Sequence, residues 1–139
     1  MKKTIMAIIL SLLLTALTNS CNSNHGSNSS YQEKVMSVEE TERSQPTRFL
    51  TADGTYNKRF GGGSFKVHGQ IKNSATVATY KDAVVKVTYY TATNTVLGSE
   101  NYTIYKTFPP HSTIDFELQV KNYKDVNSLG WDVVNAVPN

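Results

Sequence analysis

The most constraining feature of the chain is an alternation of apolar and polar residues between Tyr80 and Tyr90. In an extended strand, one face then holds Ala83, Val85, Val87 and Tyr89, and the opposite face holds Asp82, Lys86 and Thr88. The segment from Thr91 to Thr95 interrupts the run before Val96-Leu97 resume it, which predicts a β-hairpin. Because a lone hairpin is unstable in water, we expect more strands to cover its apolar face.

The same alternation recurs on both sides of this hairpin. We expect further strands at Ser64 to Asn73, Thr113 to Lys121 and Leu129 to Val137, and a first strand or pair of short strands over Phe49-Leu50 and Tyr56 to Phe60, with Asp53-Gly54 as a turn. The sequence therefore predicts six or seven strands and no long helix after residue 20. This is an all-β chain, which we expect to form a two-sheet antiparallel immunoglobulin-like sandwich, with an open barrel as the alternative.

Two of these strands carry face assignments that a structure tests directly. In the expected strand from Thr113 to Lys121, we expect the side chains of Ile114, Phe116, Leu118 and Val120 to point inward. In the last strand, Trp131 and Val133 fall on one face, and Val134 and Ala136 on the other. Apolar residues on both faces indicate that the last strand is not fully exposed on either side.

Residues 1–20 have the three parts of a secretory signal peptide. Lys2 and Lys3 form the basic start, Ile5 to Leu17 form an apolar run, and a short polar stretch follows. The apolar run is shorter than the roughly 20 residues that a membrane-spanning helix needs. Without Lys2 and Lys3, 12 basic side chains stand against 11 acidic ones, a balance that argues against a nucleic-acid-binding protein.

The only cysteine, Cys21, directly follows this leader and so excludes an intramolecular disulfide. Here the chain resembles a bacterial lipoprotein signal, in which a small residue precedes a cysteine that receives acyl chains such as palmitate. Ser20 and Cys21 match that pattern, whereas Thr18 and Asn19 depart from it. The resemblance implies anchoring of Cys21 in the cell-envelope membrane, since two acyl chains hold stably. The alternative is ordinary cleavage near Ser20, which leaves a free thiol.

Asn22 follows the cysteine and is not the aspartate that commonly retains lipoproteins in the inner membrane. If the host is Gram-negative, the outer membrane is therefore favoured. Residues 21–48 are mostly polar, and we expect a flexible linker whose reach is on the order of 30 Å. Ser37 and Glu40 have the spacing of a helix capping box. Their neighbours offer little apolar surface, so we expect no stable helix there. Residues 49–139 then form the β-sandwich domain.

Three segments of the chain resemble the FxLYD-type bacterial immunoglobulin-like domain. They are Val67 to Ser74, Tyr80 to Tyr90 and Pro110 to Phe116, and the resemblance covers most of residues 64–137. At the motif that names the family, Tyr90 matches, whereas Val87, Tyr89 and Thr91 replace the usual phenylalanine, leucine and aspartate. These are core and turn positions, so the resemblance implies a fold in a secreted or lipid-anchored protein and transfers no active site.

No motif in the chain has the spacing of a catalytic or metal site. His25, His68 and His111 fall on the linker, a strand face and a turn. The acidic residues are spread along the strands and are interpreted as solvated: Asp82, Asp115, Glu117, Asp125 and Asp132. We therefore expect a protein that is not an enzyme and has no cofactor.

The expected function is that of an interaction or structural module of the envelope, with an envelope protein or a glycan as partner. An accessory subunit or inhibitor of an envelope enzyme is the alternative. The chain has eight tyrosines, a residue type that suits such contacts. The contact residues that we expect on the outer face of the hairpin are Tyr80, Lys86 and Tyr90.

Overall fold

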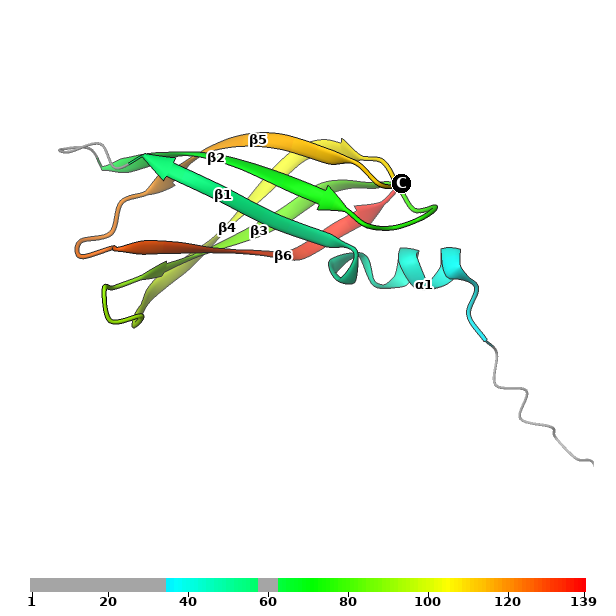
Figure 1. Ribbon diagram of the computed structural model, residues 1–139, viewed down its shortest axis with the longest axis horizontal. Coiled ribbons are helices and arrows are strands. Elements are labelled where there is room, and N and C mark those ends of the chain that lie inside the picture. Colours follow the sequence, from blue (N-terminus) through cyan, green and yellow to red (C-terminus); the bar gives the residue numbers. More distant parts are fainter. Residues whose placement is uncertain (1–34, 58–62) are drawn as a thin grey trace, which may run out of the picture. The chain divides into compact units, whose positions relative to one another are not determined.

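The computed structural model describes residues 35–57 and 63–139. Its elements are α1 (Val38–Ser44), the 3₁₀ helix η1 (Pro46–Arg48), β1 (Leu50–Asn57), β2 (Ser64–Asn73), β3 (Tyr80–Tyr90), β4 (Val96–Phe108), β5 (Thr113–Lys121) and β6 (Ser128–Pro138). The strands form two antiparallel sheets, β1-β2-β5 and β4-β3-β6, which pack against each other (Figure 1). The predicted two-sheet sandwich is confirmed.

The strand order has the neighbour relations of an immunoglobulin-like domain. Strands β1, β2 and β5 correspond to A, B and E of that fold, and β4, β3 and β6 correspond to C′, C and F. Strand β3 lies at the centre of its sheet and pairs with both β4 and β6. The strand with the clearest alternation, β3, is therefore the central strand of the second sheet, and β4 lies at its edge.

The core lies between the sheets and contains the inward faces that the alternation predicted. Ala83, Val85, Val87 and Tyr89 are fully buried on β3, and the alternation on β2 and β5 is likewise confirmed. Residues from both sheets complete one continuous cluster, including Phe65, Val67, Ile71, Phe108, Phe116 and Val120. Burial of this apolar surface contributes most of the stability of such a sandwich.

The expected turn at Asp53-Gly54 is wrong, because β1 runs through it without a break. Asp53 pairs with Gln70 and Gly54 with Gly69, so β2 holds this dipeptide in the ladder. Gly54 instead packs closely in the core, where a Cβ atom would lie 3.1 Å from the Trp131 ring. The part of the expected strand beyond Asn57 lies outside the described residues.

The expected faces of the last strand are also wrong in part. Val133 and Ala136 are both buried, whereas Val134 between them is exposed. The pairing of β6 with β3 is irregular between Lys81 and Val85, and Asp82 has a φ of 50°. A bulge of this kind changes which residues face inward, and the simple alternation does not anticipate it.

The expected flexible linker does not extend to Arg48, because α1 and η1 are ordered and pack on the sandwich. The capping box is present: the Ser37 hydroxyl accepts from the Glu40 amide, and the Glu40 carboxylate accepts from the Ser37 amide. A helix of 7 residues is too short to be stable alone, so its contacts must hold it in place. The buried residue of α1 is the charged Glu42 and not an apolar one, which is why an apolar pattern missed this helix.

Candidate functional site

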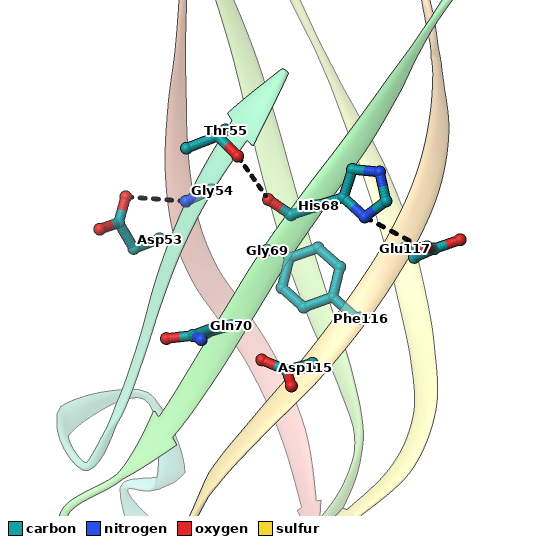
Figure 2. A pocket seen from close by; sticks show the side chains of 9 residues that line it. All are labelled: Asp53, Gly54, Thr55, His68, Gly69, Gln70, Asp115, Phe116 and Glu117. Atoms are coloured by element: carbon teal, nitrogen blue, oxygen red, sulfur yellow. Dashed lines mark hydrogen bonds and ion pairs between the residues drawn. The ribbon is translucent and has the colours of Figure 1, made fainter. Parts of the chain in front are cut away.

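The outer face of the β1-β2-β5 sheet carries an open hollow of about 530 Å³, the polar hollow. Strand register places two rows of side chains side by side across the three strands. One row is Asp53, Gln70 and Asp115, and the other is Thr55, His68 and Glu117. Figure 2 shows these six side chains around the middle row of the floor, which is Gly54, Gly69 and Phe116.

The residues of the floor explain why the sheet is hollowed at this place. A Cβ atom on Gly69 would lie 2.3 Å from Cζ of Phe116, so the aromatic ring occupies the space that a side chain would need. The ring of Trp131 lies against Gly54 in the same way, from the opposite sheet. Because two neighbouring strands lack side chains here, the rings approach the backbone closely. We infer that this lets the sheet bend toward the core and leaves the outer face concave.

One end of the polar hollow holds a small cluster of charged side chains on β2 and β5. Oε2 of Glu117 lies 3.0 Å from Nζ of Lys66, and Oε1 lies 3.0 Å from Nδ1 of His68. The hydrogen bond from Lys66 lowers the pKa of Glu117, against a smaller opposing effect of burial. Glu117 is therefore ionised and both of its oxygens have a partner, which leaves it little freedom to transfer a proton.

The other side chains of the polar hollow keep hydrogen-bonding groups for a ligand. Within the described residues, the Gln70 amide and the Asp115 carboxylate make no side-chain hydrogen bond to the protein. Asp53 accepts one bond from the Gly54 amide at 2.7 Å. The contact of Nδ1 with Glu117 leaves Nε2 of His68 available to a ligand. The polar hollow thus presents both donors and acceptors.

The three residues expected to form a contact surface on β3 do not lie together. Tyr80 is fully buried, so its assignment to the outer face is wrong, and its hydroxyl donates to the backbone oxygen of Glu42 at 2.8 Å. Burial, followed by the nearby Glu42 charge, raises the pKa of Tyr80 to about 12. Lys86 and Tyr90 are half-buried, and the Tyr90 ring lies close to Gly130, where a Cβ would be 3.0 Å away.

Cys21 and His25 lie outside the described residues. Among the residues that the structure does describe, no helix is long and apolar enough to cross a membrane. In the same residues, no group of three or more His, Cys, Asp or Glu side chains is arranged to hold a metal ion.

Glu42 forms a second polar cluster, which pattern reasoning missed entirely. Its carboxylate accepts from the amides of Thr76, Val77 and Ala78 at 2.7, 3.0 and 2.8 Å, and from the Thr76 hydroxyl at 2.8 Å. Burial alone would raise the pKa of Glu42, but these four donors lower it to about 2. Successive backbone amides that converge on one anion form a nest, and α1 fills this one with its own side chain.

Asn73 shapes the loop that binds Glu42. It is fully buried, and its side-chain nitrogen donates to the carbonyl oxygens of Ala78, Phe108 and Pro109 within 3.0 Å. Its side-chain oxygen accepts from the amide of Ala75 at 2.9 Å. The Asn-Ser end of the segment that resembles the FxLYD family therefore has a structural role here.

A third cluster joins the edges of the two sheets through tyrosines. Glu100 points between the sheets and accepts from the hydroxyls of Tyr102 at 2.6 Å and Tyr123 at 3.0 Å. The Tyr102 hydrogen bond lowers the pKa of Glu100, while burial raises the pKa of Tyr89, whose hydroxyl lies 3.3 Å from that of Tyr102. An inward-pointing charge on an edge strand also discourages pairing with another chain.

No family model, curated relative or solved structure matches the chain.

Proposed function

We propose that this protein is lipid-anchored in the bacterial cell envelope through Cys21. Its β-sandwich would act as a non-catalytic interaction module related to the FxLYD-type domain. The anchor is supported by the order of a basic start, an apolar run and a lone cysteine in residues 1–21.

The observation that carries the role of an interaction module is the polar hollow. It is concave, it is built on three rigid strands, and its side chains present unoccupied donors and acceptors. A glycosidase-type general acid needs a carboxyl group with a raised pKa. In the polar hollow, the hydrogen bond from Lys66 lowers the pKa of Glu117. This carboxylate stays ionised at neutral pH, which suits recognition better than acid catalysis.

Replacement of Cys21, the proposed lipid anchor, tests the proposed membrane localisation. In Cys21→Ser, the acyl acceptor is lost, so metabolic labelling with a palmitate analogue should disappear and the protein should leave the membrane fraction. The neighbouring Ser23→Ala serves as the matched control and should keep both the label and the membrane association. Full membrane recovery of Cys21→Ser would show that the anchor is assigned to the wrong residue.

A further inference from the structure

The polar hollow is elongated across the strands of the sheet, and we refer to its long dimension as the trench. Alternate residues of a strand lie about 6.5 Å apart, which sets the spacing of its two rows. Neighbouring strands lie about 4.8 Å apart, so the three strands give the trench a length of about 10 Å. Its volume of about 530 Å³ lies within the range of small-molecule sites. The trench therefore fits one or two ring-shaped units of a ligand that lies across the strands.

The hydrogen-bonding groups along this trench alternate between acceptors and donors. In the first row, the Gln70 amide stands directly opposite Asp115 in the register of β2 and β5, and opposite Asp53 in the register of β1 and β2. An amide beside a carboxylate can donate to one hydroxyl and accept from the next. In the second row, the Thr55 hydroxyl donates to the backbone oxygen of His68 at 3.5 Å and can still accept a hydrogen bond, and Nε2 of His68 offers a further hydrogen-bonding group.

These groups discriminate between classes of ligand. Asp53 and Asp115 disfavour an anion, because like charges repel at close range, whereas the charge of Glu117 is paired with Lys66. An apolar ligand would cover Gln70 and Asp115 and leave them without partners, which is costly for polar groups. A hydroxyl-rich ligand satisfies them, since each hydroxyl both donates and accepts.

We propose that the polar hollow binds a neutral glycan, a short stretch of an envelope polysaccharide that lies across β1, β2 and β5. This inference rests on the proposed function and names the class of ligand for the same site. In it, Gln70 and Asp115 bind neighbouring hydroxyls of one sugar ring, and His68, oriented by Glu117, binds the ring from the other wall. The backbone of Gly54 and Gly69 forms the floor of the hollow beneath the ring.

Titration calorimetry and amide NMR on the full chain, purified in detergent, test this proposal. The probes are a β-1,4-linked N-acetylglucosamine tetramer and a β-1,4-linked glucose tetramer. We expect at least one of them to bind and to shift the amide resonances of Gly54 and Gly69. We also expect Gln70→Ala and Asp115→Ala each to weaken binding at least tenfold, because each removes a direct hydrogen bond.

The control is Gln119→Ala, which removes the same side chain from an exposed position of β5 outside the polar hollow. It should bind the probe as the unaltered chain does. Failure of both probes to bind at millimolar concentration would overturn the proposal. So would binding that Gln70→Ala and Asp115→Ala leave unchanged, or that Gln119→Ala weakens equally. Loss of the glycan proposal in this way would leave the anchor intact, because the Cys21→Ser result does not depend on the ligand.

Discussion

A single carboxylate, that of Glu42, attaches α1 to the sandwich. It joins a helix that is too short to be stable alone to the loop between β2 and β3, and Tyr80 adds a bond to the backbone of the same residue. Arg43 contributes a bond to the backbone oxygen of Asn139 at 3.0 Å. Polar contacts thus fix α1 on the sandwich.

Replacement of Glu42 should lower the stability of the domain. In Glu42→Gln, the nest loses its anion, and we expect the melting temperature at pH 7 to fall by roughly 5 °C or more. Differential scanning calorimetry measures the change. The control is Glu39→Gln in the same helix, where the lost ion pair with Arg43 is exposed and should matter little.

The pH dependence of this difference has a definite sign. The pKa of Glu42 is lowered from 4.5 to about 2, so its contribution to stability is complete above pH 4.5 and is lost as the pH falls toward 2. The gap in melting temperature between the unaltered chain and Glu42→Gln should therefore narrow over that window. A gap that stays constant from pH 7 to pH 2 would contradict the assigned role of the carboxylate.

At the scale of elements, the glycines of β1 and β2 make room for aromatic rings in the core. Gly69 leaves room for the Phe116 ring and Gly54 for the Trp131 ring, and both positions lie under the polar hollow. We infer that the glycines set the shape of the outer face as well as the packing of the core.

A comparison of two glycine substitutions tests this role. In Gly69→Ala, the new methyl group would lie 2.3 Å from Phe116 Cζ and 2.8 Å from the Asp53 carbonyl oxygen. We expect it to destabilise the domain by about 1–3 kcal/mol in chemical denaturation, as overpacking does. Gly98→Ala on β4 is the matched control, because its nearest contact would be an ordinary 3.5 Å from Tyr123. Equal stability of the two variants would argue against the packing described here.

Strands β2 and β5, and β3 from Ala83 onward, were predictable because their two faces meet different environments. The face of Tyr80 was not predictable, because the bulge at Asp82 reverses the alternation before Ala83. The sequence did not predict the bulge in the pairing of β3 with β6, or that β1 continues through Asp53-Gly54. Both features depend on how a strand pairs with its neighbour. Helix α1 was missed because a buried carboxylate holds it. His68 and Glu117 are visible in the sequence, but only the register of β2 with β5 brings them together.

At the scale of the whole molecule, the two ends of the sandwich are closed by different means. Asn73, Glu42 and Tyr80 bind the loops at one end, and the cluster around Glu100 joins β4 to the chain beyond β5. Those regions are occupied by internal contacts, whereas the outer face of β1-β2-β5 presents the side chains of the polar hollow. This face is where we place recognition by the anchored protein.

Site-specific photo-crosslinking in intact cells tests that placement most directly. A photoreactive side chain at Thr55, in the polar hollow, is compared with one at Asn101, which is exposed on β4 of the other sheet. We expect a higher-mass adduct from position 55 and none from position 101. Absence of an adduct from position 55, or an equal adduct from position 101, would contradict recognition through the β1-β2-β5 face.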